Sequence, residues 1–277
     1  MMNQSDIQQC VGFGTIDGVS VRFAEGGVEN GPEILLLSPW PESILAFVPT
    51  WPIFTAVARV VAIDLPSFGM SGSREEHRNA EGMGVFLLRA VEALGLVRPL
   101  LVAPDVGTPA ALFAAHSAPE AFAGLIVGSG AIDHEDVGGI LDDLVNAPSL
   151  AGFRTITGEG FVEAAMQGLK RYDLPAAILE DYAASYEGDR LFRSIEFVRD
   201  YPRALPRLRR LLPSVTTRTR IVVGRDDPFV PLSNARLLDQ LLPNSRLDVL
   251  EAGHFVWEDQ ADAYAALAIS LLNKTRR

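Results

Sequence analysis

The chain has 277 residues, of which 48% are hydrophobic and 21% charged, and its formal net charge is −11. This composition suits one α/β domain that carries an insertion, and it excludes a disordered or fibrous chain. The acidic balance opposes binding to a phosphate backbone and gives no reason to expect a membrane surface as partner, so we expect neither.

Strand-like apolar runs alternate with helix-like segments along the chain, which predicts a mainly parallel sheet covered by helices on both faces. The chain opens with a predicted hairpin that turns at Asp17-Gly18. In chain order, the expected strands are Gly12–Ile16, Val19–Phe23, Ile34–Leu37, Arg59–Ile63, Leu100–Ala103, Leu125–Val127, Ile221–Val223 and Leu247–Leu250. Apolar spacing close to the helical period predicts helices over Met83–Leu94, Pro109–His116 and Asp262–Leu272.

Residues 133–215 break this alternation. The segment holds many arginines and the tyrosines Tyr172, Tyr182, Tyr186 and Tyr201, and no convincing buried strand. We therefore predict a core domain formed by residues 1–132 and 216–277, with residues 133–215 inserted as a helical cap domain.

The cellular compartment is indicated by cysteine use and by the N-terminus. Cys10 is the single cysteine, so no intramolecular disulfide can form, which agrees with a reducing compartment. The first six residues hold neither a basic start nor an apolar run, so we predict no signal peptide. No apolar run reaches the roughly 18 residues of a membrane-spanning helix. We expect a cytoplasmic protein, and nothing in the sequence selects an oligomeric state.

The strongest chemical motif lies where the strand Leu100–Ala103 runs into Asp105. Asp105 is followed by Gly107 and a helix of small residues. A strand, a sharp turn and a helix with a reactive residue at the apex form a nucleophile elbow, and the small side chains of Ala103 and Gly107 suit its steric demands. The following helix N-terminus favours a negative charge at the apex. The alternative is that Asp105 only caps this helix.

A second carboxylate follows a later strand. The strand Ile221–Val223 ends in a turn that contains Gly224, Asp226 and Asp227. A carboxylate at the carboxyl end of a parallel strand faces the crevice in which such sheets bind ligands. Asp227 has the better spacing from Gly224, so we prefer it to Asp226, and a simple Asp-Pro turn remains the structural alternative.

One histidine stands in a comparable position. His254 follows the last predicted strand and Gly253 and precedes a helix. The other three histidines lie in a charged loop, at a helix end and among acidic residues, at His77, His116 and His134. We therefore select Asp105, Asp227 and His254 as the candidate catalytic residues.

The order Asp105, Asp227, His254 resembles the nucleophile–acid–histidine order of the α/β-hydrolase superfamily. The segment that ends in Ser38-Pro39-Trp40-Pro41 resembles the oxyanion loop, which reads His-Gly-Trp-Pro in epoxide hydrolases, with Ser38-Pro39 in place of His-Gly. Residues 60–71 are similar to the family's Asp-x-Pro-Gly-x-Gly-x-Ser segment. The resemblance covers residues 12–132 and 216–272 and implies the α/β-hydrolase fold with a cap.

An aspartate at the elbow resembles the epoxide hydrolases and haloalkane dehalogenases within that superfamily. The resemblance implies that Asp105 attacks a saturated carbon to form an alkyl-enzyme ester, which water activated by His254 then hydrolyses. The backbone N–H groups of Trp40 and Val106 are then the expected oxyanion donors.

The leading hypothesis is an epoxide hydrolase-like enzyme acting on a small apolar substrate and water. Its acid would come from the cap tyrosines Tyr172, Tyr182, Tyr186 or Tyr201, and Trp40 and Phe255 are further substrate-binding candidates. A haloalkane dehalogenase is the alternative, although Val106 stands where such enzymes often carry tryptophan. A third reading is a non-catalytic ligand-binding protein. No metal-ligand cluster or phosphate-binding loop is visible, so we expect neither a metal nor a cofactor.

Overall fold

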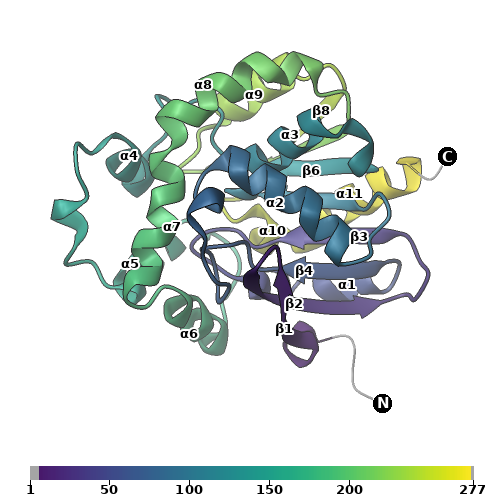
Figure 1. The fold of residues 1–277 in the computed structure, drawn as a ribbon, viewed down its shortest axis with the longest axis horizontal. Coiled ribbons are helices and arrows are strands. Elements are labelled where there is room, and N and C mark those ends of the chain that lie inside the picture. Colours follow the sequence, from purple (N-terminus) through teal and green to yellow (C-terminus); the bar gives the residue numbers. More distant parts are fainter. Residues whose placement is uncertain (1–5, 276–277) are drawn as a thin grey trace.

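An eight-stranded sheet forms the centre of the protein, whose computed structural model describes residues 6–275 (Figure 1). The sheet order is β1-β2-β4-β3-β5-β6-β7-β8. Strands β3 to β8 are parallel, whereas β2 pairs antiparallel with both β1 and β4. The strands are β1 (Val11–Ile16), β2 (Val19–Gly27), β3 (Glu33–Leu37), β4 (Arg59–Ile63), β5 (Leu100–Pro104), β6 (Gly124–Gly128), β7 (Thr219–Gly224) and β8 (Ser245–Leu250). All eight predicted strands are present, which confirms the predicted sheet.

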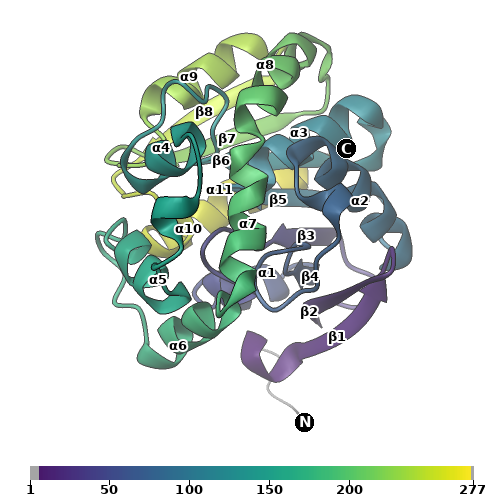
Figure 2. The same cartoon turned by 60° about the vertical axis from the view of Figure 1, so that its left-hand side comes forward.

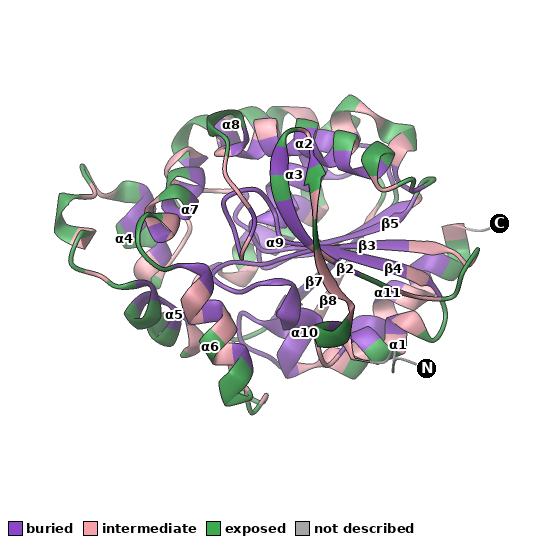
Figure 3. Ribbon diagram, turned by 60° about the horizontal axis from the view of Figure 1, so that its bottom comes forward, coloured by how far each residue is buried: buried purple, intermediate pink, exposed green. Residues whose placement is uncertain are grey.

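Helices cover both faces of this sheet (Figure 3). One face carries α2 (Ala80–Ala93) and α3 (Gly107–Ser117), and the other carries α1 (Trp51–Thr55) and α11 (Ala261–Thr275). The central strands β5 and β6 are buried at every residue, as expected for a sheet covered on both sides. The remaining core helices are α9 (Leu232–Leu241) and the short α10 (Val256–Asp259). None of the helices within residues 6–275 has the length and apolar character needed to cross a membrane.

The insertion lies between β6 and β7. Residues 129–218, all of them described, contain helices and loops but no strand. The helices are α4 (Gly139–Asn146), α5 (Gly158–Met166), α6 (Ala176–Ser185), α7 (Asp189–Arg199) and α8 (Tyr201–Leu211). They project beyond the sheet on the side where the loops after β5, β7 and β8 meet, and α8 returns toward α9 (Figures 1 and 2). We call residues 133–215 the cap; these two boundaries stay a prediction.

The N-terminal region carries two features on which the sequence analysis relied, the first residues of the chain and Cys10. Residues 1–5, which carry most of the segment on which the absence of a signal peptide was predicted, lie outside the described residues. Cys10 ends a 3-10 turn directly before β1, and burial together with Asp6 raises the pKa of its thiol. The raised pKa keeps this thiol protonated and unreactive at neutral pH.

The turn after β5 places Asp105 above the carboxyl end of the sheet. Asp105 has a φ of +51°, in the left-handed region that a non-glycine residue rarely adopts. Its backbone N–H donates to Gly128 O at 2.8 Å, and its carbonyl accepts from Thr108 N at 2.9 Å. A Cβ added to Gly130 would lie 2.4 Å from the Asp105 carbonyl oxygen, so the turn needs glycine there. This surrounding structure holds a strained backbone that costs about 1–3 kcal/mol.

Thr108 ties this turn to the next strand. Its hydroxyl donates to Ala103 O at 2.9 Å and accepts from Gly128 N at 3.0 Å, and the side chain is fully buried. Because the threonine closes a bridge between β5 and β6, the elbow depends on its hydroxyl as well as on small neighbours.

We expect Thr108→Val to lower the free energy of unfolding by about 1–3 kcal/mol, because the nearly isosteric side chain loses both hydroxyl hydrogen bonds, each of which contributes about 0.5–1.5 kcal/mol. Chemical denaturation followed by circular dichroism measures the change. Thr108→Ser, which keeps the hydroxyl, should lower the free energy of unfolding by clearly less. Equal losses in the two variants would show that methyl packing, and not the hydrogen bonds, stabilises the turn.

Candidate active site

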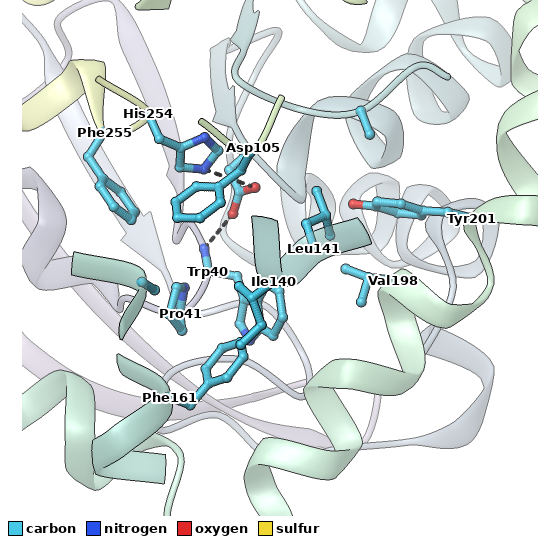
Figure 4. Close-up of a pocket in the computed structure, with 13 residues that line it drawn as sticks. Trp40, Pro41, Asp105, Ile140, Leu141, Phe161, Val198, Tyr201, His254 and Phe255 are labelled. Atoms are coloured by element: carbon cyan, nitrogen blue, oxygen red, sulfur yellow. Dashed lines mark hydrogen bonds and ion pairs between the residues drawn. The ribbon is translucent and has the colours of Figure 1, made fainter. Parts of the chain in front are cut away.

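The carboxylate of Asp105 lies at the base of a pocket between the core and the cap (Figure 4). The residue is only 7% exposed. Its Oδ2 accepts a hydrogen bond from the backbone N–H of Trp40 at 2.6 Å, and its Oδ1 lies 3.7 Å from Nε2 of His254. Helix α3 begins beyond it at Gly107, with Val106 in the capping position. The carboxylate is therefore turned toward Trp40 and His254.

His254 connects this carboxylate to a second one. The loop after β8 places the imidazole so that Nδ1 lies 2.8 Å from Oδ2 of Asp227, which follows β7. The other oxygen of Asp227 accepts from the backbone N–H groups of Phe229 and Val230, both at 2.9 Å. These two bonds fix the carboxylate that orients His254. The neighbouring Asp226 is exposed, so the structure brings Asp227 rather than Asp226 into the site.

The two carboxylates determine the charge of the histidine. Burial opposes an imidazolium, but Asp227 and Asp105 outweigh it and raise the pKa of His254 to about 10. At neutral pH the ring is therefore protonated as long as both carboxylates are ionised. Loss of either negative charge would lower this pKa.

The loop after β3 brings a backbone donor to Asp105. Ser38 accepts from the Leu65 N–H through its hydroxyl at 3.0 Å, which ties this loop to the segment that follows β4. The loop therefore delivers the Trp40 N–H despite Ser38-Pro39 standing where epoxide hydrolases have His-Gly. The Trp40 indole N–H donates to Ser194 of α7 at 2.9 Å. Val106 is buried directly after Asp105, and its N–H as a second oxyanion donor stays a prediction.

The pocket wall is almost entirely apolar. Asp105, His254 and Tyr201 supply its polar groups, and the other lining residues are Trp40, Pro41, Ala131, Ile140, Leu141, Phe161, Ala165, Val198, Phe229 and Phe255. The volume of this cavity is about 30 Å³. A polar or anionic substrate would lose its hydration there without compensation, so the pocket suits a small neutral molecule.

The four cap tyrosines lie in different surroundings. Tyr201, at the start of α8, lines the pocket and points its hydroxyl into it (Figure 4). Tyr182 donates to Glu258, and Tyr186 donates to the Glu42 carbonyl, so both hydroxyls bond outside the pocket lining. Tyr172 contacts Asp259 through its backbone N–H, and its side chain is not part of the lining. The structure thus narrows the tyrosine candidates to Tyr201.

Of the other expected binding residues, Trp40 and Phe255 both line the pocket, and the Phe255 ring meets the His254 ring edge to face at 4.9 Å. The sequence interpretation missed Phe229 and the wall formed by the cap. Phe229 was detectable, because it lies two residues after Asp227. The side chains of α4, α5 and α7 carried no sequence signal, since their apolar spacing is equally typical of core packing.

The described residues contain no group of three or more His, Cys, Asp or Glu side chains arranged to hold a metal ion. The pocket itself offers several reactive groups. It holds a buried carboxylate, a protonatable imidazole with a fixed partner, a backbone donor and one phenol.

Comparison with known proteins places this geometry in a family. Residues 34–261 match the family described as alpha/beta hydrolase fold. The chain is 26% identical over 238 residues to 2-hydroxy-6-oxo-6-phenylhexa-2,4-dienoate hydrolase of Burkholderia cepacia, covering 80% of this chain and 79% of that one. It is 36% identical to poly(3-hydroxyalkanoate) depolymerase of Ectopseudomonas oleovorans over 59 residues, which is 21% of each chain. The structure of haloalkane dehalogenase DbeA from Bradyrhizobium elkani is similar, with a TM-score of 0.79 and 19% identity over 96% of this chain and 98% of that one.

The raised pKa of His254 links stability to pH. Between the ordinary histidine pKa of about 6.5 and the folded value of about 10, the folded protein holds a proton that the unfolded chain has released. The contribution of His254 is therefore complete below about pH 6.5 and is lost as the pH rises through about 10. We expect the free energy of unfolding to fall more steeply with pH in the wild type than in His254→Gln. Urea titrations from pH 6 to 10 measure both slopes. Equal slopes would contradict the conclusion that Asp227 and Asp105 together raise the pKa of His254.

Proposed function

Because the chain belongs to the α/β-hydrolase fold family, we propose that it is a hydrolase with Asp105 as nucleophile, and that it opens epoxides of small neutral molecules. One observation carries this proposal. A buried carboxylate lies at the base of an apolar pocket, 3.7 Å from the imidazole of His254 and hydrogen-bonded to the Trp40 N–H at 2.6 Å.

The first step uses the carboxylate at saturated carbon. Oδ1 of Asp105 forms a bond to an epoxide carbon while the carbon–oxygen bond of the ring breaks. A carboxylate suits this attack because the product is an ester that water can hydrolyse, whereas attack on an ester carbonyl would give a mixed anhydride. The departing alkoxide takes a proton from a nearby acid.

Tyr201 is the acid that the pocket offers. Burial and the neighbouring Asp105 carboxylate hold the pKa of Tyr201 well above its usual value, so the phenol keeps its proton until an alkoxide forms beside it. The hydroxyl faces the cavity (Figure 4). The phenolate of Tyr201 then regains its proton from the imidazolium of His254, whose pKa falls once Asp105 is esterified.

The second step depends on a change of charge. Once Asp105 is an ester, one of the two carboxylates that raise the pKa of His254 is neutral, so this pKa falls. The imidazolium then gives its proton to the Tyr201 phenolate formed in the first step, and the neutral imidazole becomes a base. His254 then removes a proton from water, which attacks the ester carbonyl. The Trp40 N–H already donates to Oδ2, the atom that becomes the oxyanion. Collapse of the intermediate breaks its bond to the diol oxygen, which takes the proton of the added hydroxyl. The diol leaves, and Asp105 is again a carboxylate beside a protonated His254.

The alternatives have weaker support in this pocket. A haloalkane dehalogenase needs N–H donors for the departing halide, and the Trp40 indole already donates to Ser194. Val106 supplies no second indole. A protein that only binds its ligand would not require a nucleophile, an oriented histidine and a phenol in contact with one cavity.

We expect the purified protein to convert small terminal epoxides to diols. Tyr201→Phe should lower the rate of opening by about 10²-fold or more, because the alkoxide loses its acid. Tyr172→Phe is the matched control, since that side chain lies outside the pocket lining. Halide release from short haloalkanes without diol formation, or equal rates in the two phenylalanine variants, would contradict the proposed chemistry.

A further inference from the structure

Two carboxyl groups that the proposed reaction does not use lie buried behind the pocket. Glu42 follows Pro41 in the oxyanion loop and is 0% exposed, and Glu258 lies on α10, four residues after His254, and is 3% exposed. The two side chains lie near each other, because the indole of Trp257, the residue before Glu258, donates to Glu42. Among the described residues, neither forms an ion pair with a lysine or arginine. Two ionised carboxylates in this position would repel each other without compensation.

The donors around the pair leave one oxygen of each carboxyl unmatched. The Trp257 indole donates to Oε2 of Glu42 at 3.1 Å, and the Tyr182 hydroxyl donates to Oε1 of Glu258 at 3.2 Å. Oε1 of Glu42 and Oε2 of Glu258 are buried and have no donor from any other residue. A single proton between these two atoms would satisfy all four oxygens and leave one negative charge facing two donors.

We propose that Glu42 and Glu258 share one proton at neutral pH, and that this acid pair positions both the oxyanion loop and the histidine loop. The role in catalysis rests on the proposed function, whereas the shared proton does not. Burial, with Glu258 and Asp105, raises the pKa of Glu42 well above its usual range, and burial raises the pKa of Glu258 as well. Both directions agree with a retained proton.

The pair joins the segments that carry the reacting groups. Glu42 lies two residues after Trp40, whose N–H holds Asp105, and its carbonyl accepts from Tyr186 of the cap. The indole that binds Glu42 meets the His254 ring edge to face at 6.0 Å. Displacement of either carboxyl would therefore move the Trp40 N–H or the imidazole of His254 relative to Asp105. A misplacement of about 1 Å can lower the rate about 10²-fold.

Loss of the shared proton at alkaline pH would place two negative charges in the same buried volume. The titratable groups that face the pair are Tyr182 on α6, Tyr172 before α6, Tyr186 after it, Asp259 on α10, and Asp105. None of these supplies a positive charge. Repulsion within the pair should then separate the two loops and remove activity.

Infrared spectroscopy of the full-length protein tests the shared proton without a substrate. We expect a carbonyl band of a protonated carboxyl at neutral pH that disappears in Glu42→Gln and in Glu258→Gln, whose amides donate the same hydrogen bond without a titrating proton. Glu251→Gln is the matched control, because Glu251 is an exposed carboxylate that pairs with Arg225. Absence of the band in the wild type, or its persistence in both buried variants, would overturn the proposal.

The positioning role is read from pH titrations. Tryptophan fluorescence should change at alkaline pH in the wild type and in Glu251→Gln, and this change should be absent in the two buried glutamine variants. With an epoxide that the protein hydrolyses, Glu42→Leu should lower kcat by about 10- to 100-fold, and Glu42→Gln should restore most of it and move the alkaline loss to higher pH. An unchanged alkaline limb in both glutamine variants would overturn the positioning role even where activity itself confirms Asp105.

Discussion

The clamp of two carboxylates on one imidazole is the interaction on which the rest of the site depends. Asp227 is fixed by two backbone N–H groups and holds Nδ1 of His254 at 2.8 Å, while Asp105 lies on the other side at 3.7 Å. With both carboxylates ionised the ring is protonated. In the reaction we propose, esterification of Asp105 removes one of these charges, so the protonation of His254 follows the state of Asp105.

The fold supplies this clamp because three parallel strands end at the same edge. Asp105, Asp227 and His254 follow β5, β7 and β8, which lie on either side of β6 in one sheet. The elbow adds a strained residue that is held by Thr108 and by the close approach of Gly130. Secondary structure and sheet order thus bring together three residues of which the first and last lie 149 positions apart in the printed sequence.

The cap is fixed to this edge by a buried ionic network. Arg22 of β2 donates to Asp64 at 2.6 Å and to Asp181 of α6 at 2.7 Å, and Ser43 donates to Asp181 at 2.6 Å. Breaking a buried pair by removing one partner costs about 3–5 kcal/mol, so α6 is firmly held. The apolar side chains of α4, α5 and α7 then determine how large a substrate the small cavity accepts.

Features that depend on local sequence pattern and chain order could be predicted from the sequence. The strands followed from short apolar runs, and the elbow followed from an acidic residue between a strand and a helix of small residues. Asp227 was preferred to Asp226 by spacing alone, and the structure brings Asp227 to His254. The selection of Tyr201 among four tyrosines could not be predicted, because it depends on how the cap helices pack. The neighbours Glu42 and Glu258 lie 216 positions apart, and the only signal was an acidic residue within an apolar stretch.

The covalent alkyl ester on Asp105 is the central claim, and its mass is the most direct measurement. In His254→Gln the ester should form but not hydrolyse, because no base activates water. After brief exposure to an epoxide, intact-protein mass spectrometry should show the added mass of one substrate molecule, and peptide mapping should place it on the peptide that contains Asp105. An adduct on another residue, or turnover by the wild type with no adduct in this variant, would contradict the account.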